Sequence, residues 1–76
     1  PKKAEMNENE ISKILLQSFS NHFLVSIQLK NLDEDGRFSE DIKGLVEGYY
    51  NENMVTISGT TVYLDEINHV EIIQFL

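Results

Sequence analysis

Cysteine and tryptophan are absent from this 76-residue chain, and its single proline is the first residue. Without cysteine, the chain can form neither disulfides nor thiolate-based zinc or iron–sulfur sites. No apolar run approaches the roughly 18 residues of a transmembrane helix, and no signal peptide is recognisable. We therefore expect a soluble, cytoplasmic protein that has no contact with a membrane.

Basic residues are also scarce, with six Lys and Arg against 13 Asp and Glu and a net charge of −7. The imbalance begins at Asn31, after which ten acids face only Arg37 and Lys43. Proteins that bind nucleic acids neutralise phosphates with Lys and Arg, so this acidic half disfavours that function. A chain this short buries only about 60% of its unfolded surface, and association with itself or with a protein partner is a common remedy.

The N-terminal part of the sequence predicts an arm and one helix. Residues 1–6 have no periodicity and are expected to form a flexible arm before a single domain at residues 7–76. Asn7 and Glu10 have the spacing of an N-cap and its capping-box partner. The segment that follows has apolar residues at helical spacing, which predicts one buried stripe formed by Ile11, Ile14, Leu15 and Phe19.

After this helix the hydrophobic period changes from about 3.6 residues to two. Alternation in residues 23–30 predicts a half-buried strand, and four further strand-like segments follow at residues 42–50, 54–58, 61–64 and 70–76. Polar turns lie between them, and Asp65–His69 is predicted to form a compact bend. A helix followed by five short strands predicts a mainly-β, closed or nearly closed five-stranded barrel with the helix covering one end.

The segment KGLVEGYYNENMVTI at residues 43–57 resembles the first motif of the Sm-like (Sm, LSm and Hfq) superfamily of SH3-like small barrels. The motif expects glycine or apolar residues where this chain has Gly44, Val46, Gly48, Tyr49, Val55 and Ile57. TVYLDEINHVEII, at residues 61–73, is a looser echo of the second motif, and the C-terminal half is also similar to YolD-like proteins of bacteria and their phages. The resemblance implies an Sm-like domain that joins other copies through strand edges to form rings.

The RNA-binding positions of the Sm-like pattern are altered in this chain. An Asp before the turn and an Asn after it line the RNA pocket of that family, whereas Tyr50 and Met54 stand there in this chain. The cations of the second motif are replaced around Leu64, Asp65 and Glu66. Because two acids would repel phosphate, we interpret the RNA site as degenerate.

The stretch NLDEDGRFSEDI, from Asn31 to Ile42, looks like the first half of a calcium-binding loop. Asp33 and Asp35 fall on the third and fifth positions, and Gly36 on the sixth. The twelfth position, which needs a bidentate Glu, is Ile42, and the flanking segments have the pattern of strands instead of helices. We therefore interpret the stretch as an acidic bend and predict no metal site.

No group of residues has the spacing of an active site. His22 and His69 are the only histidines and belong to no local cluster. Asp65, Glu66 and Glu71 would need a cleft to act as an acid–base pair, and the interior of so small a barrel is filled by side chains. We predict no catalytic residue and no cofactor.

The residues expected at an interface are Tyr49, Tyr50, Met54, Asp65, Glu66 and His69. Of the tyrosines, Tyr63 is predicted to face inward, and one of the adjacent Tyr49 and Tyr50 must face outward. An exposed tyrosine surrounded by acids is typical of a protein interface.

These observations favour a non-enzymatic interaction or regulatory module that self-associates, as a ring in the Sm-like manner, or binds a protein partner. The alternative is Sm- or Hfq-like RNA binding through Lys2, Lys3, Lys13 and the tyrosines.

Overall fold

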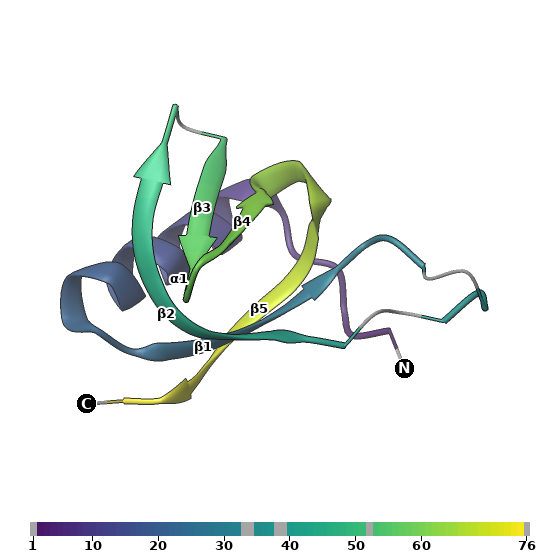
Figure 1. The fold of residues 1–76 in the computed structure, drawn as a ribbon, viewed down its shortest axis with the longest axis horizontal. Coiled ribbons are helices and arrows are strands. Elements are labelled where there is room, and N and C mark those ends of the chain that lie inside the picture. The colour runs from purple at the N-terminus through teal and green to yellow at the C-terminus, as the bar shows by residue number, and fades with distance from the viewer. Residues whose placement is uncertain (1, 33–34, 38–39, 52, 76) are drawn as a thin grey trace.

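The computed structural model describes residues 2–32, 35–37, 40–51 and 53–75. One helix and five strands follow one another along the chain (Figure 1): α1 Glu8–Asn21, β1 Leu24–Leu29, β2 Ile42–Tyr50, β3 Met54–Ile57, β4 Thr60–Tyr63 and β5 Ile67–Gln74, with the 3-10 turn η1 Leu64–Glu66 before β5. The prediction of a mainly-β fold with one N-terminal helix is confirmed.

Helix α1 begins at the predicted cap. The Asn7 side chain accepts a hydrogen bond from the Glu10 backbone N–H at 2.9 Å, and the Glu10 carboxylate accepts one from the Asn7 N–H at 3.2 Å. This capping box satisfies N–H groups that have no partner inside the helix. His22 ends the helix in the left-handed conformation, with φ 59°, and its N–H donates to the Ser18 carbonyl.

The buried face of α1 is centred on Ile11 and Leu15, which are 1% and 0% exposed. Ser18 completes this face, fully buried, and its hydroxyl donates to the Ile14 carbonyl at 2.7 Å. Phe19, predicted to be buried, is 44% exposed, and that prediction is wrong. At 3.6 residues per turn, Phe19 lies about 80° round the helix from Ile11, which places it at the rim of the buried face.

The five strands form one antiparallel sheet in the order β4-β3-β2-β1-β5. The predicted closure into a barrel is wrong: β4 and β5 are the two edges of the sheet and do not pair within the described part of the chain. The chain leaves β4 at Tyr63, turns through η1 and enters β5, which pairs with β1 instead. The sheet therefore keeps two edges.

Strand β2 bends strongly and connects the two halves of the sheet, as Figure 1 shows. Its pairing with β3 shifts between Val46 and Gly48, a bulge that sharpens the bend. Near its start, Gly44 lies directly beneath the β3–β4 turn, where a Cβ atom would overlap the side chain of Ser58. That turn has positive φ at both Ser58 (42°) and Gly59 (89°), as a two-residue hairpin turn of type I′ requires.

The hydrophobic core lies between the inner face of the sheet and α1, which packs on β5 and β2. Its fully or nearly fully buried members are Ile11, Leu15, Val25, Ile27, Val46, Val55, Ile57, Val62, Leu64, Ile67 and Val70.

Strand β5 begins at Ile67, three residues before the predicted start. The predicted bend over Asp65–His69 is correspondingly shorter, because Ile67 pairs with Leu29 and His69 with Gln28. Burial of Ile67 beside Leu29 explains the early start, since both side chains join the core.

Candidate functional site

Two regions outside the core concentrate polar and aromatic side chains. The first, which we call the tyrosine row, consists of Tyr50, Met54 and Tyr63. Tyr50 is the register partner of Met54, and Met54 is the register partner of Tyr63, so the three lie side by side across β2, β3 and β4. Directly opposed residues on neighbouring strands share a face of the sheet.

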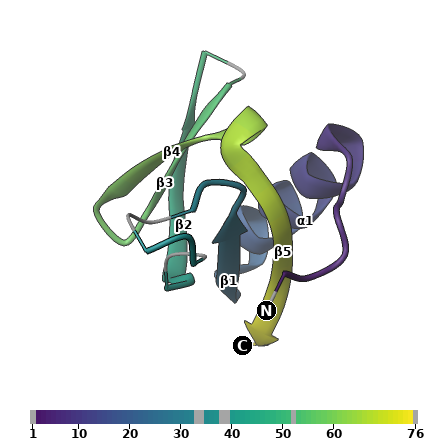
Figure 2. The same cartoon turned by 90° about the vertical axis from the view of Figure 1, so that its right-hand side faces the viewer.

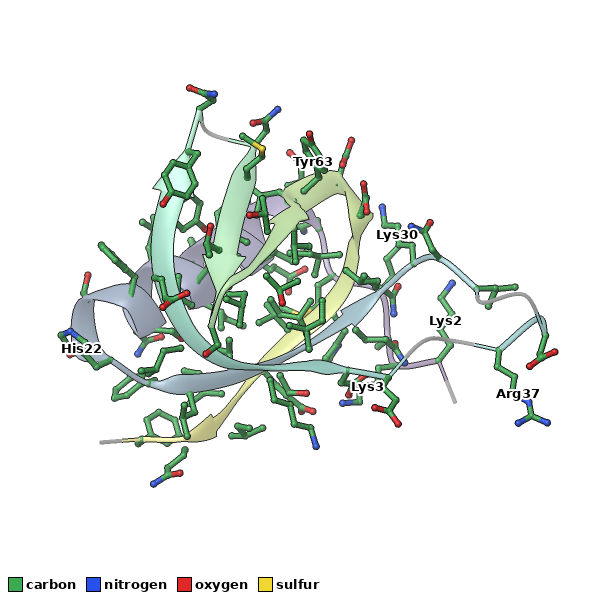
Figure 3. The ribbon with its side chains drawn as sticks, in the orientation of Figure 1. Lys2, Lys3, His22, Lys30, Arg37 and Tyr63 are labelled. Atoms are coloured by element: carbon green, nitrogen blue, oxygen red, sulfur yellow. The ribbon has the colours of Figure 1, made fainter. Side chains whose placement is uncertain are left out.

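The tyrosine row is accessible to solvent. Tyr50 is 51% and Tyr63 is 47% exposed, and Met54 between them is half-buried. The prediction that Tyr63 faces inward is wrong; Figure 3 shows it on the outside of the β4 end of the sheet. Tyr50 folds back over Gly48, where a Cβ atom would approach its hydroxyl to 3.1 Å.

The opposite face of the same three strands belongs to the core. Tyr49 is the register partner of Val55, and Val55 of Val62, both of which are buried. The Tyr49 hydroxyl donates to the Ser12 carbonyl of α1 at 3.5 Å, and burial raises the pKa of this hydroxyl. As predicted, one of the two adjacent tyrosines faces outward, and it is Tyr50.

Asp65 and Glu66 lie in η1, immediately after the tyrosine row in the chain. Asp65 is exposed and Glu66 is half-buried, with its carbonyl accepting the Lys30 N–H at 2.8 Å. Asp65 also borders an open depression between η1 and the start of α1, whose other charged lining residues are Glu5, Glu8, Glu10 and Lys30. Four acids and one base make this depression unfavourable for phosphate.

The second region consists of the N-terminal arm, residues 3–6, and the side chains of β1 and β5 that contact it. His69 is one of these side chains. The His69 Nδ1 atom lies 2.9 Å from the Ala4 carbonyl oxygen, and its Nε2 lies 3.9 Å from a Glu71 carboxylate oxygen. His69 is on β5, at the opposite edge of the sheet from Tyr63 on β4. The six residues expected at an interface are therefore not brought together. Tyr50 and Met54 are in the tyrosine row with Asp65 and Glu66 just after it in the chain, His69 lies beside the arm, and Tyr49 packs against the core.

Lys3 anchors the arm on the outer face of β1 and β5. Its ammonium nitrogen lies 2.6 Å from a Glu71 carboxylate oxygen and 3.2 Å from one of Asp41. The Asp41 carboxylate also accepts the Ser26 hydroxyl at 3.3 Å. The hydrogen bond from Lys3 lowers the pKa of the Glu71 carboxyl, and the Glu71 and Asp41 carboxylates together raise the pKa of Lys3.

Beneath Lys3, two amide side chains are buried. Gln28 is 4% exposed, and its Oε1 accepts both the Lys3 backbone N–H and the Asn68 side-chain N–H at 2.9 Å. Asn68 is fully buried and donates to the Lys3 carbonyl, also at 2.9 Å. Burial without such bonds would be costly for these amides, so the arm is part of the packing of β1 and β5.

The arm then passes along the outer edge of β5. The Met6 N–H donates to the Asn68 carbonyl at 2.9 Å, and the Val70 N–H lies 3.3 Å from the Met6 sulfur. Figure 2 shows the N-terminal segment running beside β5 before it enters α1. Nothing in the composition of residues 1–6 predicted these contacts. The available signal was the presence of polar Ser26 and Gln28 in an otherwise apolar strand. That strand is buried on both faces, so its polar side chains need partners from another segment.

The remaining candidate groups are those of the acidic loop and His22. Asp33 lies outside the described residues, and Gly36 in the same loop has φ +77°, as a tight bend allows. His22 lies at the opposite end of the molecule from Lys2 and Arg37 (Figure 3). Across the described ranges, no three His, Asp or Glu residues come close enough together to hold a metal ion.

Comparison of the chain with protein-family models, with curated proteins and with solved structures finds no match. Within the described part of the chain, no helix has the length and apolar character needed to span a membrane.

Proposed function

We propose that this chain is a non-enzymatic, cytoplasmic interaction module with an Sm-like arrangement of one helix and five strands, which associates with further copies of itself through strand edges. The observation that supports this most is the open sheet: β4 and β5 form its two edges and are not joined to each other in the described residues. An unpaired edge is a template for another strand. If β4 of one copy pairs with β5 of the next, the copies associate head to tail, and such an arrangement can close into a ring.

The β4 edge directs the backbone groups of two residues away from the sheet. Ile57 and Thr60 flank the two-residue turn and therefore form the first hydrogen-bonded pair of the hairpin. Hydrogen-bonded and non-bonded pairs alternate in antiparallel strands, so the N–H and C=O groups of Thr61 and Tyr63 point away from β3. A second strand would meet these groups first.

The β5 edge offers the complementary groups. The Asn68 carbonyl and the Val70 N–H point away from β1, since both are bonded to Met6 of the arm. By the same alternation, the backbone of Ile72 faces that side as well. Among the described residues, the arm's hydrogen bonds to outward backbone groups of this edge are those at Asn68 and Val70.

The tyrosine row supports protein contact at the β4 end. Tyrosine and methionine are enriched at protein interfaces, and Tyr50, Met54 and Tyr63 form a continuous row that ends on the edge strand itself. With Asp65 next to the row, a heterologous partner would be one that presents basic groups, because opposite charge raises the encounter rate.

The alternative function, RNA binding, would use lysines together with the tyrosines. Lys3, however, is bonded to two carboxylates, and Tyr49 faces the core. The net charge of −7 per chain opposes phosphate binding further, and ring formation would multiply this repulsion. Self-association is therefore the better supported function.

Light scattering over a range of concentrations tests the proposal. We expect a mass above the 8.8 kDa monomer at high micromolar concentration, and binding of oligo-U or oligo-A no tighter than roughly millimolar at physiological salt. A monomer at every concentration would contradict self-association. Micromolar RNA affinity that falls steeply with salt would support the alternative.

A further inference from the structure

We infer that the N-terminal arm and the β4 strand of a second copy compete for the same edge of β5, so that release of the arm strengthens self-association. The inference rests on the proposed function and adds that the arm regulates this self-association. It arises because residues 3–6 wrap round β5: Lys3 lies on the outer face of the sheet, and Met6 lies on the edge itself.

The arm occupies the backbone groups that an incoming strand would need. The Met6 N–H donates a hydrogen bond to the Asn68 carbonyl at 2.9 Å, and the Met6 sulfur lies 3.3 Å from the Val70 nitrogen. Sulfur is a weak acceptor, so a backbone carbonyl from another chain would replace it with a stronger hydrogen bond. With the arm in place, pairing can use β5 only from Ile72 onward.

The incoming strand is short, which makes the lost positions matter. β4 spans four residues, Thr60–Tyr63, and its outward backbone groups are those of Thr61 and Tyr63. When the arm is released, the outward backbone groups of Val70 become available in addition to those of Ile72. β5 then presents two successive outward-facing residues, which match the two of β4. The occupant is thus a second copy of this chain, presented edge to edge.

The anchor of the arm is suited to release. Lys3 and Glu71 are only partly covered by the protein, with side chains 36% and 46% exposed, and exposed ion pairs are weak. If β5 is uncovered in only a fraction of chains, the apparent dissociation constant for pairing equals the intrinsic constant divided by that fraction. Weakening the anchor raises the fraction and tightens the association.

The test compares Lys3→Glu with Lys2→Glu by sedimentation equilibrium. Both substitutions change a positive charge into a negative one, so general repulsion between copies changes equally. Of the two lysines, Lys3 is the one whose ion pairs with Glu71 and Asp41 hold the arm. We expect the dissociation constant of Lys3→Glu to be lower than that of Lys2→Glu by at least roughly threefold. Hydrogen exchange at the Met6 amide reports whether the arm has been released.

The charge-swapped double variant Lys3→Glu with Glu71→Lys restores the ion pair and the parent's net charge. We expect it to move both the Met6 exchange and the dissociation constant from the Lys3→Glu values back toward those of the parent. The return is partial, because the carboxylate introduced at position 3 still faces Asp41. Equal dissociation constants for Lys3→Glu and Lys2→Glu, in a chain that does self-associate, would overturn the inference and leave the proposed function standing. If every variant stays monomeric while Met6 exchange shows a released arm, the proposed function and the inference both fail.

Discussion

The two halves of the sheet differ in what covers their outer faces. On β2, β3 and β4, the outer face presents the tyrosine row to solvent, and only the inner face is buried. On β1 and β5, the arm covers the outer face, and four consecutive residues of β1, from Val25 to Gln28, are buried. The comparison shows that one half has an accessible face and edge, whereas the other half has both partly occupied by the chain's own N-terminal segment.

The largest expected effect concerns the helix that both halves share. Leu15→Ala should lower the free energy of unfolding by about 2–5 kcal/mol, because Leu15 is 0% exposed within the core. Leu16→Ala is the matched control one position along α1; Leu16 is 52% exposed, and the change should stay within about 0.5 kcal/mol. Urea melts measure both variants. Equal melts would mean that α1 does not support either half.

Gly44 lies in β2, the strand that connects the two halves of the sheet, and a substitution there tests how the β3–β4 turn packs on β2. Gly44→Ala should destabilise the fold by about 1–3 kcal/mol, because the new Cβ would overlap the Ser58 side chain. Adding Ser58→Gly removes that side chain, and glycine suits the positive φ of this position. We expect the second substitution to recover part of the loss in the same urea melts. Recovery stays partial because alanine is strained at the Gly44 φ of +158° and because Ser58→Gly removes the hydroxyl that accepts the Leu45 N–H at 3.0 Å. Additive losses would contradict the packing of the β3–β4 turn on β2.

A buried amide distinguishes the covered half from the open one. Asn68→Ala should cost about 1–2 kcal/mol, because it removes the hydrogen bonds to Gln28 and to the Lys3 carbonyl in a site closed to water. Asn53→Ala, at the exposed β2–β3 turn of the open half, should change stability by less than about 0.5 kcal/mol. If thermal melts show equal effects, the arm does not protect the polar groups beneath it.

The smallest effect is a pH dependence located on the arm. The folded pKa of Glu71 is lower than its ordinary value of 4.5, so its stabilising interaction with Lys3 is complete at neutral pH and is lost as the pH falls through the lowered folded pKa. The melting temperatures of the parent and of Glu71→Gln should therefore differ most near about pH 7 and converge in acid. Glu40→Gln, in the exposed loop between β1 and β2, is the control for the loss of one negative charge.

The sequence predicted well those elements that depend on local patterns. The capping box at Asn7 and Glu10 and the strand at residues 42–50 follow from residue spacing alone. Spacing also required one of Tyr49 and Tyr50 to face outward, and the structure identifies it as Tyr50. The inward position expected for Tyr63 was wrong, because its side was assigned without the register that opposes it to Met54.

The features that were missed depend on contacts between segments distant in sequence. The open sheet arises because β5 pairs with β1, at least 38 residues earlier in the chain, and does not pair with β4 within the described residues. The role of residues 3–6 depends on Gln28, Asn68 and Glu71, and no periodicity in the arm itself could indicate these partners.

The proposed pairing of the open β4 edge with another copy can be blocked by one substitution, Thr61→Pro. Proline removes the outward-facing N–H of Thr61 without disturbing the ladder to β3, because an edge strand tolerates proline on its solvent side. Thr61→Val keeps the N–H and is the control. We expect Thr61→Pro to melt like Thr61→Val but to sediment as a monomer at high micromolar concentration, while Thr61→Val self-associates like the parent. Undiminished association of a folded Thr61→Pro chain would show that copies do not pair through the β4 edge.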